Sequence, residues 1–126
     1  MKHQMNAIGI HIATGGRKFD AAGEVVIMLH GSGQNHLTWV LQSRYFAYRG
    51  FAVLAPDFPG HGLSGGSPLE SIEAMAAWVI ELMDSLDVKQ AILVGHSQGR
   101  LVTIEAAASY PDRVRRVALI AGAMAI

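Results

Sequence analysis

A serine flanked by glycines stands in the segment GHSQG, which covers residues 95–99. A serine hydroxyl attacks a carbonyl carbon efficiently only when a base removes its proton, and that base is usually a histidine held by a carboxylate. All six histidines of the chain precede Ser97. The pattern therefore indicates a nucleophile whose base does not follow it within these 126 residues.

The segments on either side of Ser97 predict a strand, a tight turn and a helix. Residues 91–94 read AILV, which is typical of a buried strand, and residues 98–110 favour a helix that Pro111 ends. This is the context of a nucleophile elbow, in which flanking glycines avoid collisions and the serine stands on a strained turn. We therefore expect Ser97 to have a positive φ or another strained conformation, and not to be a plain helix N-cap.

Strands and helices alternate along the rest of the chain. Apolar runs predict strands at residues 7–13, 25–29, 51–57 and 115–121, and a helix is predicted at 37–49. The clearest helix covers residues 67–86, with Ser67 as the expected N-cap, Pro68 in the first turn and Glu70 completing a capping box. The alternation indicates an α/β fold, with a mostly parallel sheet of about six strands and helices on both faces.

The composition narrows the classes of function. The formal net charge is zero, so we expect neither nucleic acid nor an anionic membrane surface as a partner. The absence of cysteine excludes disulfides, thiolate metal sites and a cysteine nucleophile, and it is compatible with a cytoplasmic location, which we expect. Residues 1–10 lack the apolar stretch of a signal peptide, and the longest apolar run, 117–126, is too short to span a bilayer.

Four motifs stand in a recognisable order. They are LHGSGQN (29–35), DFPGHGLS (57–64), GHSQG (95–99) and YPDRVRRVALIAG (110–122). Together they resemble the N-terminal half of an α/β-hydrolase fold protein of the serine esterase, lipase and haloperoxidase-like kind. In that family the catalytic acid and histidine follow later strands, so we expect a single, truncated domain over residues 1–126 with an incomplete triad.

The resemblance assigns roles to particular residues. It implies that Ser97 is the catalytic nucleophile and that the backbone amides of Ser32 and Gln98 form the oxyanion hole. It further implies a group of residues that support the loop and the elbow, which are His30, Gly31, Gly95, His96 and Gly99. Because the nucleophile is serine and not aspartate, the resemblance argues against the dehalogenase and epoxide hydrolase branches.

The function that this resemblance implies is hydrolysis of a small ester or thioester by acyl transfer through Ser97, and a carbon–carbon bond hydrolase is a variant of the same class. The alternative is a non-catalytic half-domain that binds a small ligand or a partner chain. The missing base favours this alternative, as does Arg100, which stands where the family usually has glycine or alanine.

Other candidate sites are weaker. His30, His36, His61 and His96 lack close ligand spacing, so we expect no metal, and GSGQNH lacks the lysine of a phosphate-binding loop, so we expect no nucleotide or other cofactor. Asp57 suits a backbone-capping role as well as a catalytic one. The apolar strand near residues 114–120 should form an edge of the sheet and favour self-association.

Overall fold

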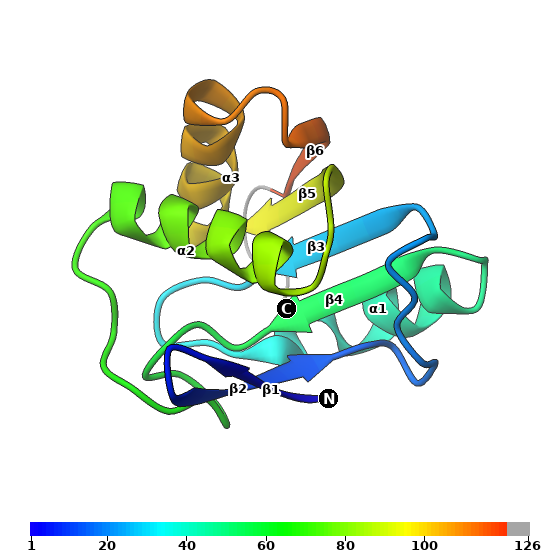
Figure 1. Ribbon diagram of the computed structural model, residues 1–126, viewed down its shortest axis with the longest axis horizontal. Coiled ribbons are helices and arrows are strands. Elements are labelled where there is room, and N and C mark those ends of the chain that lie inside the picture. The colour runs from blue at the N-terminus through cyan, green and yellow to red at the C-terminus, as the bar shows by residue number, and fades with distance from the viewer. Residues whose placement is uncertain (121–126) are drawn as a thin grey trace.

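A six-stranded sheet forms the centre of the protein in the computed structural model, which describes residues 1–120 (Figure 1). The strand order is β1-β2-β4-β3-β5-β6. The strands are β1 (Lys2–Met5), β2 (Ile8–Ala13), β3 (Val25–Leu29), β4 (Ala52–Pro56), β5 (Ala91–His96) and β6 (Val114–Ile120). The helices are the 3₁₀ helix η1 (His36–Trp39), α1 (Val40–Ala47), α2 (Ile72–Ser85) and α3 (Gln98–Ser109).

The sheet is mostly parallel, as expected. Strands β4, β3, β5 and β6 run parallel, whereas β1 and β2 form an antiparallel hairpin whose second strand pairs antiparallel with β4. In that pairing Ile12 lies opposite Pro56. The register therefore places the residue before Ile12 beside the residue after Pro56, which matters for the site below.

Both faces of the sheet are covered, because the central strands are apolar on both sides. All residues of β3 and β4 are buried. Ile27 and Leu29 pack in the larger core with α2 and α3, while Val26 and Met28 pack on the other face with Trp39 and α1. Alternate residues of a strand point to opposite faces, so an unbroken apolar run is what a sheet with two covers requires.

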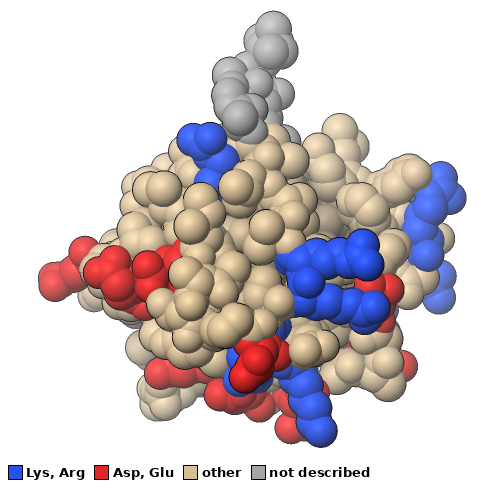
Figure 2. All heavy atoms as spheres, turned by 90° about the horizontal axis from the view of Figure 1, so that it is seen from above, with Lys and Arg blue, Asp and Glu red and all other residues tan. Residues whose placement is uncertain are grey.

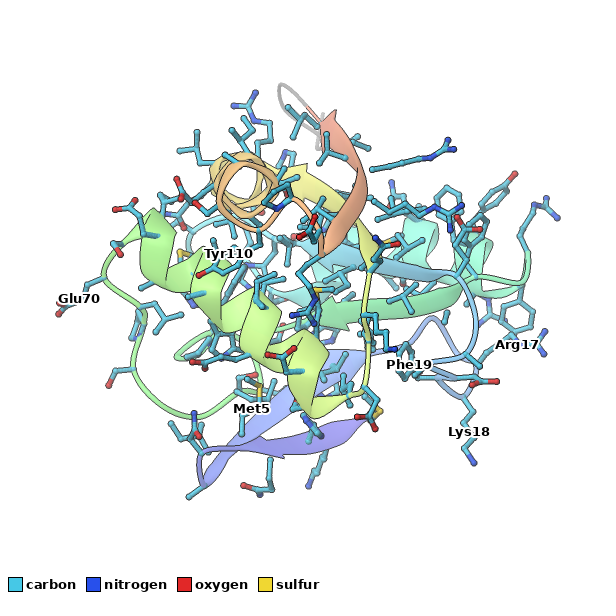
Figure 3. All side chains as sticks on the ribbon, turned by 45° about the horizontal axis from the view of Figure 1, so that its top comes forward. Met5, Arg17, Lys18, Phe19, Glu70 and Tyr110 are labelled. Atoms are coloured by element: carbon cyan, nitrogen blue, oxygen red, sulfur yellow. The ribbon has the colours of Figure 1, made fainter. Side chains whose placement is uncertain are left out.

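Helix α2 begins later than the sequence predicts, and the capping box assigned to Ser67 and Glu70 is wrong. The N-cap is Ser71, whose hydroxyl accepts a hydrogen bond of 3.0 Å from the Ala74 amide. A Cβ built on Gly60 would lie within 2.6 Å of the Pro68 nitrogen, so Pro68 packs against the backbone of Gly60 in a loop instead of opening the helix. Glu70 is exposed and directed away from α2 (Figure 3).

The predicted helix over 37–49 is shorter in the structure and divided. Residues 36–39 form the 3₁₀ turn η1, and only Val40–Ala47 are α-helical. Asn35 caps η1 by accepting a hydrogen bond of 2.8 Å from the Leu37 amide. No helix within residues 1–120 is long and apolar enough to cross a membrane.

Candidate active site

Ser97 stands on a strained turn between β5 and α3, as the sequence predicts. Its backbone has φ 57° and ψ −125°, a combination that non-glycine residues rarely adopt. Its side chain is exposed and does not cap the helix. Strain of this kind costs on the order of 1–3 kcal/mol and persists only where the surrounding structure enforces it.

Two glycines allow the turn. A Cβ on Gly95 would overlap the carbonyl of Gly99, and a Cβ on Gly99 would overlap the carbonyl of Leu29 at the end of β3. The elbow, α3 and β3 are therefore in direct backbone contact. This close approach is the physical reason for glycine at both positions.

The loop after β3 passes directly beside the serine. A Cβ added to Gly31 would lie 2.8 Å from Ser97 Cβ and 3.1 Å from Ser97 Oγ. Within residues 1–120, the backbone amides of Ser32 and Gln98 donate to no acceptor. The Gln98 amide also belongs to the first turn of α3, where the helix dipole favours negative charge.

Gln34 holds this loop in shape, and the sequence analysis did not identify it. Its side-chain Oε1 accepts a hydrogen bond of 2.9 Å from the Gly31 backbone amide, while the backbone amide of Gln34 donates to the Gly31 carbonyl at 3.1 Å. The same oxygen lies 3.4 Å from His96 Nδ1. Gln34 thus connects the loop after β3 to the residue that precedes Ser97.

His30 is a structural residue of the loop and not a base for Ser97. It is buried, its Nδ1 lies 2.7 Å from the Gly31 carbonyl, and its Nε2 accepts a hydrogen bond of 3.1 Å from the Phe58 amide. A carbonyl only accepts, so Nδ1 carries the hydrogen and both ring nitrogens are used. Burial lowers the pKa of His30, which favours this neutral form.

The other nearby histidine rings are also directed elsewhere. His61 Nδ1 lies 3.1 Å from the Pro59 carbonyl, and the buried His96 ring packs edge-on against Trp39. Within residues 1–120, no hydrogen bond joins any histidine to Ser97 Oγ. The described residues therefore contain the expected nucleophile and the two expected oxyanion donors, but no histidine in hydrogen-bond contact with Ser97 Oγ.

Asp57 lies directly after the end of β4, and its carboxylate fixes two neighbouring loops. It is fully buried, and its carboxylate accepts hydrogen bonds of 2.6 Å from the His36 amide and 2.9 Å from the Leu63 amide. These contacts favour the backbone-capping interpretation over a catalytic one. They also bring His36 to Asp57, with His11 beside them, a cluster that the sequence analysis missed because it depends on strand register.

Arg100 lies in the first turn of α3 and is partly exposed. Its Nε is 3.4 Å from the Ser97 carbonyl, which is a long and weak contact. The side chain is therefore accommodated beside the elbow without a close partner of opposite charge among the described ion pairs.

Ser97 lies on a glycine-bounded turn after the fifth strand, beside the loop that follows the third strand. A comparison of the sequence with family profiles agrees with this arrangement. The profile of the alpha/beta hydrolase fold family matches residues 24–126. This chain belongs to the α/β-hydrolase family. The membership confirms the resemblance stated above and the assignment of the fold as an incomplete α/β-hydrolase sheet.

The relatives that this chain resembles are named for different hydrolase reactions. It is 33% identical over 101 residues to an (E)-2-((N-methylformamido)methylene)succinate hydrolase of Acinetobacter baylyi, covering 79% of this chain and 38% of the relative. It is 34% identical over 100 residues to bifunctional epoxide hydrolase 2 of Sus scrofa, covering 77% of this chain and 18% of the relative.

A solved structure shows the same arrangement. Epoxide hydrolase A from Mycobacterium thermoresistibile superimposes with a TM-score of 0.78 at 29% identity, over 94% of this chain and 37% of that chain. The α/β-hydrolase chain thus spans less than half the length of each of these relatives.

Proposed function

We propose that this chain carries the nucleophile and the oxyanion hole of a serine hydrolase that cleaves small carboxylic esters or thioesters by acyl transfer. The observation that carries the proposal is the position of Ser97, at φ 57° and in close approach to Gly31, while the amides of the following residues, Ser32 and Gln98, donate to no acceptor within residues 1–120. In this reaction Ser97 Oγ attacks the carbonyl carbon, its proton passes to water or to a base, the two amides stabilise the oxyanion, and the alkoxide or thiolate leaves. Water then cleaves the acyl-serine ester, which releases the carboxylic acid and restores the Ser97 hydroxyl.

The relatives are named for different reactions, and the identity of the nucleophile limits which of these reactions we expect of this chain. An aspartate that opens an epoxide forms an ester, which water can cleave. A serine that opened an epoxide would form an ether, which water does not cleave under mild conditions. Because residue 97 is serine, turnover is expected only with substrates that leave an ester on the enzyme, and acyl groups are such substrates.

The proposal separates acylation from deacylation. A general base contributes about 10²–10⁴-fold to rate, and no base contacts Ser97 within residues 1–120. We therefore expect the 126-residue chain to be acylated slowly by an activated ester and to release the acyl group even more slowly. An oxyanion hole without a complete triad still accelerates related reactions by about 10³–10⁴-fold over water.

The experiment uses p-nitrophenyl acetate with the purified chain and a Ser97→Ala control. One equivalent of p-nitrophenol, with an acetyl group found on Ser97 by mass spectrometry, is the expected result. Release of the same amount by the Ser97→Ala chain would contradict the proposal. Sustained turnover that is lost in the control would support the nucleophile and would show that a base reaches Ser97 in solution.

A second function is favoured by the same missing contact. If a folded chain is not labelled at Ser97 by a fluorophosphonate probe, the chain is a half-domain that binds a small ligand or a partner chain without catalysis. Circular dichroism of the sample treated with the probe must show a folded chain, because an unfolded chain would also remain unlabelled.

A further inference from the structure

Three side chains that are distant in sequence meet at the end of β4. His11 comes from β2, His36 is the first residue of η1, and Asp57 follows β4. One ligand atom from each residue lies within 4.8 Å of the others. The antiparallel pairing of Ile12 with Pro56 places His11 next to Asp57, and the Asp57 amide donates to the His11 carbonyl at 2.9 Å.

Asp57 fixes the ring of His36. His36 Nδ1 lies 2.9 and 3.0 Å from the two carboxylate oxygens. A carboxylate only accepts hydrogen bonds, so Nδ1 carries the hydrogen and a neutral ring presents the lone pair of Nε2 away from Asp57. A carboxylate behind a histidine in this way sets the tautomer and raises the basicity of the nitrogen that faces a metal ion.

His11 supplies a second imidazole. Its ring centroid is 4.6 Å from that of His36, at an interplanar angle of 53°. The His11 side chain has no hydrogen bond among the described contacts, and its ring is therefore able to turn without breaking one.

The charge of the cluster also suits a cation. Asp57 is fully buried, and within residues 1–120 it forms no ion pair with lysine or arginine. Hydrogen bonds from the His36 and Leu63 amides and from His36 Nδ1 hold this carboxylate in place, and its negative charge lies behind the His36 ring, where it favours a cation on Nε2. His11 lines one surface hollow and His36 lines another, and both residues are partly exposed, so solvent reaches both residues.

From this geometry we propose that His11 and His36, with Asp57 behind His36, bind one divalent transition-metal ion of the zinc class. Imidazole nitrogens suit Zn²⁺, Ni²⁺ and Cu²⁺, whereas Mg²⁺ requires oxygen ligands. Zinc bonds of about 2.1 Å place tetrahedral ligand atoms about 3.4 Å apart, so the two imidazole nitrogens would take up this spacing on binding. The ion would connect β2 and η1, with Asp57 after β4 behind His36, and it is separate from Ser97, which follows β5.

Zinc chloride is the probe, added to the chelator-treated 126-residue chain and followed by isothermal titration calorimetry at pH 7.5. We expect saturable binding of one zinc ion per chain and a thermal midpoint that rises with zinc concentration. In His11→Ala the affinity should fall at least about tenfold. The matched control is His3→Ala, which removes an imidazole that contacts Ser85 and lies outside the cluster, and it should bind like the wild type.

Three results would overturn the proposal. They are no saturable zinc binding, binding that His11→Ala leaves unchanged, and binding that His3→Ala weakens as much as His11→Ala does. The His11→Gln variant controls for unfolding, because it keeps a polar side chain. Its zinc affinity should also fall about tenfold, while its circular dichroism spectrum should match that of the wild type. Saturation by Mg²⁺ in place of zinc would equally contradict the assignment.

Discussion

At the scale of single residues, the side chain of Gln34 joins the loop after β3 to His96, the residue before Ser97. Gln34→Ala removes the acceptor of the Gly31 amide, and the loop beside Ser97 should lose its fixed shape. We expect acylation by p-nitrophenyl acetate to slow by about tenfold, which is less than the about 10²–10³-fold lost when an oxyanion donor itself is removed.

The control for this prediction is Gln34→Glu, which keeps an oxygen at the same distance from the backbone. Its acylation rate should lie closer to the wild type than that of Gln34→Ala. Equal rates for the alanine variant and the wild type, measured as the burst of p-nitrophenol, would show that the loop holds its shape without Gln34.

His30 makes stability depend on pH. Its pKa is lowered in the folded chain, first by burial, so the unfolded chain binds more protons once the pH falls below about 6.5. The stabilisation is complete above that pH and is lost as the pH falls toward the folded pKa. The free energy of unfolding, from urea titrations, should therefore be lower at pH 5.5 than at pH 7.0.

The His30→Asn variant tests the source of that slope. His11 shifts in the same direction, so the variant should keep part of the dependence on pH but show a smaller difference between pH 7.0 and 5.5. A slope as steep as that of the wild type would assign the effect to other groups.

The residues of the candidate site were predictable from the sequence only where their arrangement depends on residues close to them in the chain. Ser97 and its two glycines form one local turn, and the sequence identified them and the strained backbone. The His11–Asp57 contact depends on which residues of β2 and β4 face each other, and Gln34 depends on how a loop folds back on itself. No periodicity or spacing carries that information.

At the scale of elements, the start of α2 offers a direct comparison of two serines. Ser71→Ala removes the hydroxyl that accepts from Ala74, and it should lower the free energy of unfolding by about 1 kcal/mol. Ser67→Ala is the matched control, because Ser67 is exposed in the loop and should change stability by less than about 0.5 kcal/mol. Urea denaturation of both variants tests which serine caps α2. A larger loss of unfolding free energy for Ser67→Ala than for Ser71→Ala would indicate that the helix starts at Ser67.

The elements themselves were predictable because their apolar patterns are strong. The runs at 25–29 and 91–94 correspond to β3 and to most of β5, and the alternation with helices gave the parallel sheet. Helix starts were less predictable. Ser67, Pro68 and Glu70 form a good local capping signal, but the packing of Pro68 against Gly60 overrides it.

At the scale of the whole molecule, the face over α3 and β6 combines uncharged areas with charged side chains. Figure 2 looks down on this face and shows uncharged areas between the lysine, arginine, aspartate and glutamate side chains, and β6 itself carries the exposed Arg115 and Arg116. The side chains of Leu101, Ile104, Val117 and Leu119 are each 45–54% exposed there. Within residues 1–120, β6 pairs with β5 alone and forms an edge of the sheet, as the sequence predicts.

We expect the 126-residue chain to self-associate through this face. An apolar strand with an unpaired edge is a template for another chain, and lysine on the edge opposes such pairing. Light scattering should give a mass that rises with protein concentration, and Val117→Lys should shift the chain toward monomer. A constant monomer mass for the wild type at high concentration would contradict the expectation.

The position of β3 has a consequence for motion. This strand lies between β4 and β5, all its residues are buried, and the loop that borders Ser97 starts at its end. Amide hydrogens in such a strand exchange with solvent only when much of the molecule opens, whereas hairpins at a sheet edge open locally and often. We therefore expect the loop that borders Ser97 to start from a slowly exchanging strand. Movements that admit a substrate are then expected in segments farther from β3, and the start of this loop should change position little.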